Sequence, residues 1–279
     1  RCGGSAETVV DMNRIQKKFA EIKKRRGKAL SVFLTAGCPS LGATQDLVTG
    51  LEKAGVDFFE IGFPFSDPFA DGATIQKSSE KALHNGVTWQ KTLTLCKSIR
   101  KVSQVPLIFM SYANVFYVRG WDRSAQELSR AGLDGVIVPD LIPGQDTAAE
   151  LAFRKHGLDL VYLLAPTSSA ERIALVGRKS RGFIYAVSVA GVTGARKSLP
   201  EQEVTRFLSR IKKASKLPVV LGFGISEPGQ VLRLKKNTDG FVIGSAMMKV
   251  VDQPAGQRKL LARAENFIRP FVKALNRGA

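Results

Sequence analysis

The stretch "AGVDFFEIG", residues 54–62, joins the end of an amphipathic segment to a short turn and an apolar run. The same order returns in "AGLDGVIVP" (131–139) and "NTDGFVIGS" (237–245). Apolar runs rich in Val, Ile and Phe and bounded by Gly or Pro are typical of parallel strands buried on both faces. The repeated phrase therefore predicts one helix–turn–strand unit that is used several times along the chain.

Apolar runs of this kind occur eight times. They lie at residues 30–36, 57–62, 105–111, 134–139, 158–164, 182–188, 217–224 and 239–245. Segments with helical spacing lie between them, at residues 43–54, 73–83, 88–103, 122–131, 147–156, 169–180, 200–215 and 227–236. An open doubly wound sheet usually has fewer strands. The pattern therefore favours an α/β protein, a (β/α)8 TIM barrel with extra N- and C-terminal helices at 12–25 and 257–276.

The composition favours one large domain. The chain has 279 residues, 44% of them hydrophobic, with no break in composition, so we expect residues 1–279 to form a single barrel domain with 1–11 as a flexible N-terminal segment. No apolar run is long enough to span a membrane. Cys2, Cys38 and Cys96 have no disulfide or zinc spacing, which favours a reducing compartment such as the cytoplasm. With only two histidines, we expect no metal site.

The net charge of +18 raises the question of a nucleic-acid partner. However, Lys and Arg are spread along segments such as "QKKFAEIKKRRGK" (16–28) and "RIKKASK" (210–216), where they alternate with apolar residues. That pattern indicates solvated helix faces. The pattern therefore argues against a nucleic-acid partner.

The first candidate for chemistry is Glu60, near the end of an otherwise apolar run. At a barrel mouth a desolvated carboxyl has a raised pKa, which suits a general acid or base. The alternative is a structural acid paired with a buried Lys or Arg, but the other strand ends offer no such partner. Asp71 follows in "FADGATIQ", where the residues alone favour a helix N-cap or turn, and Asp67 in "SDP" is typical of a turn residue.

Three glycine-rich segments follow the last three expected strands: "VAGVTGAR" (189–196), "GFGIS" (222–226) and "GSAM" (244–247). Barrel phosphate sites are commonly built from these loops, because glycine lets backbone N–H groups approach the phosphate. A phosphorylated ligand is therefore predicted. The residues alone indicate a phosphate-ester enzyme that works with carboxylates and needs neither a metal nor a covalent nucleophile.

The segment "FFEIGFPFSDPFADGATIQ" (58–76) closely resembles the signature of the tryptophan synthase alpha subunit family. The segments "SYANVF", "GVIVPDL", "FIYAVSVAGVTGAR", "LGFGIS" and "VIGSAMMK" follow in the family's order. The resemblance implies a lyase of tryptophan biosynthesis that cleaves indole-3-glycerol phosphate to indole and glyceraldehyde 3-phosphate. Glu60 would be the general acid/base, protonating indole C3 and taking up the glyceryl hydroxyl proton. Asp71 would hold the indole N–H.

The resemblance also implies the rest of the site. It places the phosphate at Gly194, Gly224, Gly244 and Ser245. It lines the substrate pocket with Phe33, Met110, Tyr112, Tyr185, Thr193 and Val242. Asp140 has a counterpart near the family's site, and Thr193 lies on a loop that closes over substrate in the family.

The family further implies a partner. We expect an α2β2 complex with a tryptophan synthase beta subunit, which would carry pyridoxal phosphate, and no cofactor on this chain. The loop after 57–62 and the segment 111–120 match surfaces that meet this partner. One alternative is a stand-alone lyase that releases free indole; a more distant one is a basic RNA-binding scaffold on a relic barrel. Related phosphate-binding barrels fit less well, because they need charged residues or a cysteine in the first strand.

Overall fold

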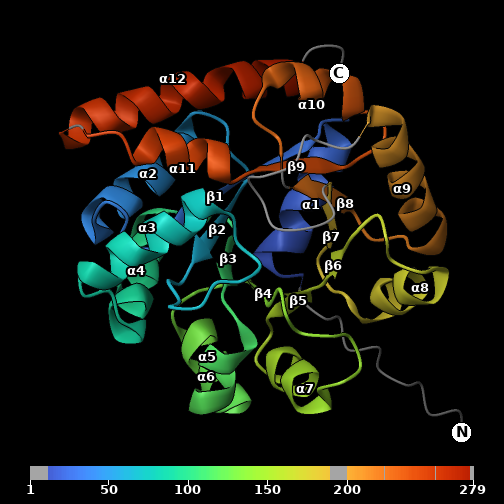
Figure 1. The fold of residues 1–279 in the computed structure, drawn as a ribbon, viewed down its shortest axis with the longest axis horizontal. Coiled ribbons are helices and arrows are strands. Elements are labelled where there is room, and N and C mark those ends of the chain that lie inside the picture. The colour runs from blue at the N-terminus through green and yellow to red at the C-terminus, as the bar shows by residue number, and fades with distance from the viewer. Residues whose placement is uncertain (1–11, 189–199, 223, 255, 277–279) are drawn as a thin grey trace, which may run out of the picture.

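A computed structural model describes residues 12–188, 200–222, 224–254 and 256–276. The strands are β1 (Ala29–Thr35), β2 (Phe58–Gly62), β3 (Leu107–Met110), β4 (Gly135–Ile137), β5 (Asp159–Val161), β6 (Leu163–Leu164), β7 (Ile184–Val187), β8 (Val219–Gly222) and β9 (Gly240–Ile243). The helices are α1 (Arg14–Lys24), α2 (Leu41–Lys53), α3 (Ala73–His84), α4 (Trp89–Val102), α5 (Ala113–Arg119), α6 (Trp121–Arg130), α7 (Thr147–Lys155), α8 (Ala170–Lys179), α9 (Glu201–Ala214), α10 (Pro228–Leu234), α11 (Ser245–Val251) and α12 (Gln257–Asn276). The helices surround a central sheet of parallel strands (Figure 1).

The sheet is a TIM barrel, as predicted. Its strand order is β5-β4-β3-β2-β1-β9-β8-β7-β6, and its two end strands are separated in sequence by Tyr162 alone. The Tyr162 N–H donates to the Ser180 hydroxyl at 3.1 Å, whereas its carbonyl accepts from the Tyr185 N–H at 3.1 Å. The expected strand 158–164 is therefore divided into β5, which pairs with β4, and β6, which pairs with β7.

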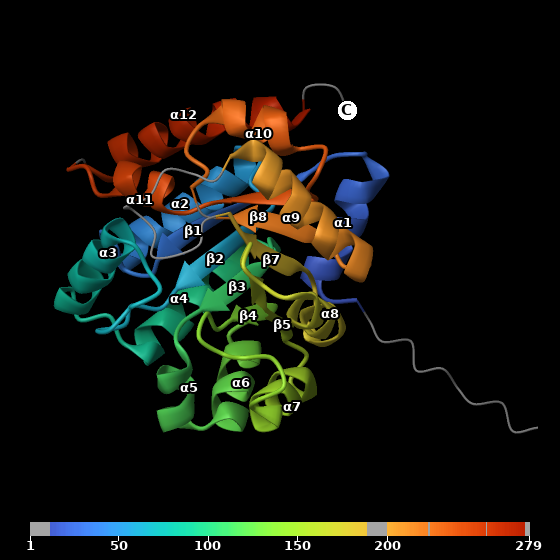
Figure 2. The same ribbon diagram turned by 45° about the vertical axis from the view of Figure 1, so that its right-hand side comes forward.

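The two extra helices close the barrel from outside. Phe19 of α1 packs against Phe58 at the start of β2 and against Phe183 just before β7, with ring centroids 4.8 and 5.8 Å apart. Helix α1 therefore covers the end of the barrel where the strands begin. Helix α12 lies along α2, α10 and α11, as Figures 1 and 2 show. None of the described helices combines the length and apolar character that crossing a membrane requires.

Two helices, α5 and α11, were not expected from the sequence. Each has seven residues, so the apolar period repeats too few times to be recognised. Both follow strand ends, at the face of the barrel where functional loops gather. Helix α11 supplies part of the site described below.

The repeated phrase that indicated the fold has a shared structural role. In each copy, the aspartate before the strand accepts a hydrogen bond from a backbone N–H at the start of the neighbouring strand, and its own N–H donates to the same residue's carbonyl. The pairs are Asp57 with Leu30 (3.0 Å), Asp134 with Leu107 (2.9 Å) and Asp239 with Val219 (2.9 Å). Each aspartate thus satisfies a strand-start N–H that the ladder leaves unpaired.

Basic residues recur in the last turns of the helices. Every described helix has Lys, Arg or His in its last turn, and in a βα unit the helix runs back to the face where the strands begin. Exposed cations complement the negative helix C-termini there. Less exposed basic side chains in last turns also pair with the strand-start aspartates, as Arg100 does with Asp134 at 3.0 Å.

Candidate functional site

A cavity of about 850 Å³ opens at the C-terminal ends of the barrel strands. Most of the predicted site residues border it: Phe33, Glu60, Asp71, Met110, Tyr185, Gly224, Val242, Gly244 and Ser245. Tyr112 is not among the residues that line this cavity. Gly194 and Thr193 lie outside the described residues.

Glu60 lies within the barrel, in strand β2, beside Phe33 of β1 and Ile108 of β3. It is 1% exposed, and this burial raises the pKa of its carboxyl to about 8, partly opposed by a hydrogen bond from Ser31. The Ser31 hydroxyl donates to Oε1 at 3.2 Å, whereas Oε2 has no hydrogen-bond partner among the described residues. Glu60 is therefore a buried acid that neutral pH leaves largely protonated.

Asp71 lies in the turn before α3. Its side chain does not cap that helix, because the N-cap residue is Gly72 and no side chain bonds the helix start. The backbone instead holds the turn, through the Asp71 N–H to the Pro68 carbonyl at 2.9 Å and the Gln76 amide to the Asp71 carbonyl at 2.9 Å. Burial raises the pKa of Asp71 to about 6, and a hydrogen bond from Tyr112 opposes the rise. The capping alternative is thus excluded, and the carboxylate faces the cavity.

Tyr112 contacts the β2–α3 loop that carries Asp71. Its hydroxyl oxygen accepts the Ala70 N–H at 3.0 Å, and the same hydroxyl opposes the rise in the pKa of the Asp71 carboxyl. Its ring packs between Phe65 and Phe69, at centroid distances of 5.3 and 5.2 Å. The phenol therefore holds the β2–α3 loop and its carboxylate in one position.

Replacing Tyr112 by Phe should raise the pKa of Asp71 by about one unit, because the lost donor favoured the ionised carboxylate. Carbon-13 NMR titration of labelled aspartate would measure the change. Tyr117→Phe is the matched control, since that side chain is 73% exposed on α5. An unchanged Asp71 titration in Tyr112→Phe would contradict the role of the phenol.

Two glycines at strand ends make room for the rings of the cavity wall. A Cβ on Gly62 would lie 2.3 Å from Cζ of Phe33, and a Cβ on Gly222 would lie 2.3 Å from Oη of Tyr185. Such approaches are far inside van der Waals contact. Both positions therefore need a residue without a side chain.

Gly222→Ala should lower the free energy of unfolding by about 1–3 kcal/mol, because the new methyl must displace Tyr185. Urea denaturation would measure the loss. Tyr185→Leu removes the clashing atoms, so it should cost less in the Gly222→Ala background than alone. Gly42→Ala on α2 is the control, because a Cβ there meets nothing within 4 Å. Additive effects of the two replacements would refute the proposed clash.

The opposite end of the cavity is formed by backbone groups and by the side-chain amide of Gln230, which was not predicted from the sequence. Gly244 is the N-cap of α11, and the N–H groups that follow it have no acceptor within the helix. Gly224 has φ +77°, a conformation that favours glycine. The Gln230 side chain donates to the Gly224 carbonyl at 3.0 Å and accepts from the N–H groups of Ser226 and Glu227. The E-x-x-Q capping box at 227–230 was a sequence signal for it.

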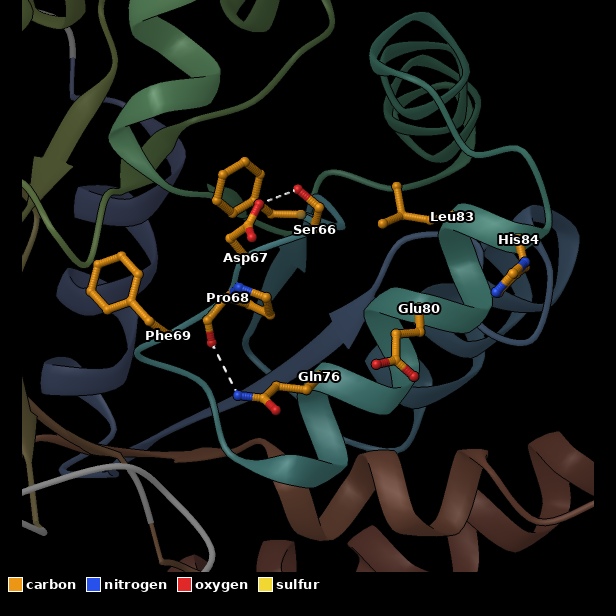
Figure 3. A pocket seen from close by; sticks show the side chains of 9 residues that line it. Ser66, Asp67, Pro68, Phe69, Gln76, Glu80, Leu83 and His84 are labelled. Carbon is orange, nitrogen blue, oxygen red and sulfur yellow. Dashed lines mark hydrogen bonds between the residues drawn. The ribbon is translucent and has the colours of Figure 1, made fainter.

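Other residues singled out from the sequence lie outside the cavity. Asp140 accepts the Ala113 N–H at 2.9 Å and so begins α5. Asp67 accepts a hydrogen bond from Ser66 in the β2–α3 loop. That loop and α3 border a separate hollow of about 710 Å³ (Figure 3). Within the described residues, no group of three or more His, Cys, Asp or Glu could hold a metal ion.

Comparison with known proteins agrees with this fold. The family model described as tryptophan synthase alpha chain matches residues 19–276. Tryptophan synthase alpha chains of Geobacter sulfurreducens and Dehalococcoides mccartyi are 46% and 41% identical; each comparison covers 95% of this chain, and 98% and 100% of the relative.

Solved structures indicate the same family. The tryptophan synthase alpha subunit of Legionella pneumophila superposes with a TM-score of 0.87 at 34% identity, over 95% of this chain and 99% of that one. A chain of Mycobacterium tuberculosis tryptophan synthase gives 0.86 at 32% identity, over 96% of this chain and 100% of that one. Because both the family model and these relatives span nearly the whole barrel, the chain belongs to the tryptophan synthase alpha chain family.

Proposed function

We propose that this cavity cleaves indole-3-glycerol phosphate to indole and glyceraldehyde 3-phosphate, a lyase reaction of retro-aldol type. The observation that carries the proposal is a pair of buried carboxylates, Glu60 and Asp71, at one cavity whose other end consists of glycine backbone and a helix start. One part of such a site moves protons, and the other binds a phosphate.

The two carboxyl groups have different pKa values, which suits them to different roles. Near neutral pH Glu60, with a pKa of about 8, is mostly protonated, whereas Asp71, with a pKa of about 6, is mostly ionised. Glu60 would give its proton to indole C3, and the cation formed on the ring nitrogen would be stabilised by Asp71. The Glu60 carboxylate would then accept the glyceryl hydroxyl proton as the carbon–carbon bond breaks, so that the aldehyde and indole leave and the acid is restored.

The binding roles follow from the positions of the remaining residues. The rings of Phe33 and Tyr185, with Met110 and Val242, would enclose the indole. The N–H groups at Gly244 and Ser245 would bind the phosphate, with Gly224 held by Gln230. Lys249, one turn along α11, borders the same cavity and adds a positive charge at that end. No cofactor is assigned to this chain.

Exposed large side chains on the β2–α3 loop and on α5 support a beta-subunit partner. Phe69 of the β2–α3 loop is 65% exposed, and Tyr117 and Val118 of α5 are 73% and 77% exposed. Figure 3 shows the Phe69 ring extending from the loop beside the hollow. Exposed apolar residues of this size mark interaction surfaces. We assign this surface to the beta subunit, which would carry pyridoxal phosphate in an α2β2 complex. The buried free thiols of Cys38 and Cys96 suit a reducing compartment such as the cytoplasm.

The test is indole release from indole-3-glycerol phosphate, measured with the chain alone and with a tryptophan synthase beta subunit. We expect slow release that the partner accelerates, and a large loss in Asp71→Asn with or without it. Tyr117→Glu should abolish the acceleration and leave the basal rate unchanged. Leu151→Glu on α7 is the matched control, since Leu151 is 49% exposed on a different helix.

Two other outcomes would change the assignment. Fast release that the beta subunit does not alter would make the protein a stand-alone lyase. No release in either setting, from folded protein, would refute the proposed reaction.

A further inference from the structure

Ser31 is an unusual residue at its position in the barrel. It lies in β1, whose sequence "ALSVFLT" is otherwise apolar until Thr35, and it is paired in register with Phe58 of β2 and Val242 of β9. Its side chain is 3% exposed. A hydroxyl in such surroundings needs a hydrogen-bond partner, because water is excluded.

The partner of Ser31 is the acid that the proposed reaction uses. The hydroxyl donates to Oε1 of Glu60 at 3.2 Å, in the buried interior between β1 and β2. Oε2 of the same carboxyl has no partner among the described residues. The two oxygens of one carboxyl group are therefore in different environments.

This difference determines where a proton can reside. An oxygen that accepts a hydrogen bond from a hydroxyl is the poorer site for a proton of its own, so the proton of neutral Glu60 belongs on Oε2. The same contact limits rotation of the carboxyl group. Glu60 lines the cavity, and Oε2 is then the oxygen that can exchange a proton with a bound molecule.

We propose that Ser31 is a positioning residue for Glu60, which fixes Oε1 and so makes Oε2 the oxygen that donates and recovers the proton. This inference rests on the proposed function, in which Glu60 is the acid/base. The other titratable groups near Glu60 are Asp71 and Tyr185, and the pKa of Tyr185 is raised by burial and by the charges of Glu60 and Asp71. The hydroxyl that donates to Oε1 is that of Ser31. The neighbouring positions on β1, β3 and β9 (Phe33, Ile108, Met110 and Val242) carry no charge.

The experiment follows the protonation of Glu60 itself. In an infrared pH titration, the carboxylic-acid band that disappears in Glu60→Gln reports the pKa of Glu60 without substrate. Ser31→Ala should raise that pKa by about 0.5–1 unit, because a donor that favours the ionised form is lost. Ser31→Thr, which keeps the hydroxyl, should restore it. We also expect kcat for indole release to fall about 10-fold in Ser31→Ala, with KM changed less than twofold.

The controls separate positioning from packing. Ser124→Ala removes another buried hydroxyl, one with no partner within the described chain, and should leave the Glu60 band unmoved. Ser31→Cys keeps the size with a weaker donor and should give an intermediate shift. An unmoved Glu60 titration in Ser31→Ala overturns the proposal, and so does a shift that Ser31→Thr fails to reverse. Because the titration needs no turnover, it tests the role of Ser31 independently of whether the proposed reaction occurs.

Discussion

Glu60→Gln should abolish indole release and at the same time make the protein more stable. Glutamine keeps the size of the side chain but cannot exchange a proton, so we expect kcat to fall at least about 1,000-fold if Glu60 acts at both proton transfers. Residual activity within about 10-fold of the wild type would exclude Glu60 as the acid/base.

The stability gain follows from the burial of the acid. The pKa of Glu60 rises from 4.5 to about 8 in the folded chain, so the unfolded state ionises first. Between these two values the folded state binds the extra proton, and the free energy of unfolding falls as pH rises. Glutamine has no carboxyl group to ionise, so Glu60→Gln does not have this loss of stability with rising pH. The variant should therefore be more stable by about 2–4 kcal/mol near pH 8 and nearly equal to the wild type near pH 4.5.

Urea denaturation at several pH values would measure the difference. The wild-type midpoint should decline from pH 5 to pH 8 more steeply than that of Glu60→Gln. Glu203→Gln on α9 is the control, because that side chain is exposed and the slope should not change. Parallel curves for wild type and Glu60→Gln would show that Glu60 ionises normally in the folded chain.

The second large effect is expected at the other end of the barrel, where Asp134→Ala should lower the free energy of unfolding by about 3–5 kcal/mol. The carboxylate is 3% exposed and binds Arg100 at 3.0 Å and Arg14 at 2.9 Å, in addition to the Leu107 N–H. Its removal leaves the guanidinium of Arg100, 12% exposed, without its counter-charge. Breaking one side of a buried pair costs more than the pair itself contributes.

The repeated phrase supplies the matched control. Asp239 makes the same bond to a strand start, but its carboxylate is 35% exposed, and its partners Lys28 and Lys212 are 26% and 35% exposed. Asp239→Ala should therefore cost only about 1 kcal/mol. Equal losses at the two positions would show that the strand-start hydrogen bond, and not the buried charge, determines the cost. Asp134→Asn, which keeps an acceptor for Leu107, should recover part of the loss.

Much of the fold could be predicted because its units repeat. Buried parallel strands leave long apolar runs, and the recurrent aspartate before the strand marks where each begins. Residues such as Tyr162 could not be foreseen, because a strand is interrupted there by a hydroxyl from another segment, Ser180. The short helices α5 and α11 were missed since one or two turns carry too little periodicity.

The candidate site, like the fold, could be predicted from the sequence only in part. Glu60 could be singled out because a carboxylate in an apolar strand is conspicuous in sequence, whereas Asp71 was assigned a role only through the family resemblance. Ser31 was not identified, and Tyr112 was named only as a pocket residue, because both act through contacts between segments distant in sequence. Gln230 had a local signal, its capping box, but its bond to Gly224 depends on how the loop folds back.

Tyr162, the single residue between β5 and β6, is the point at which the strand is interrupted. The two strands follow each other in one segment, in which β5 pairs with β4 and β6 pairs with β7. Between them, the Tyr162 N–H donates to the Ser180 hydroxyl and not to the backbone of a neighbouring strand. Local opening of a closed sheet starts where the fewest backbone bonds must break. In hydrogen exchange, the amide of Tyr162 should therefore lose its protection before those of Ile108 or Leu221. Local opening of the sheet would then begin between β5 and β6.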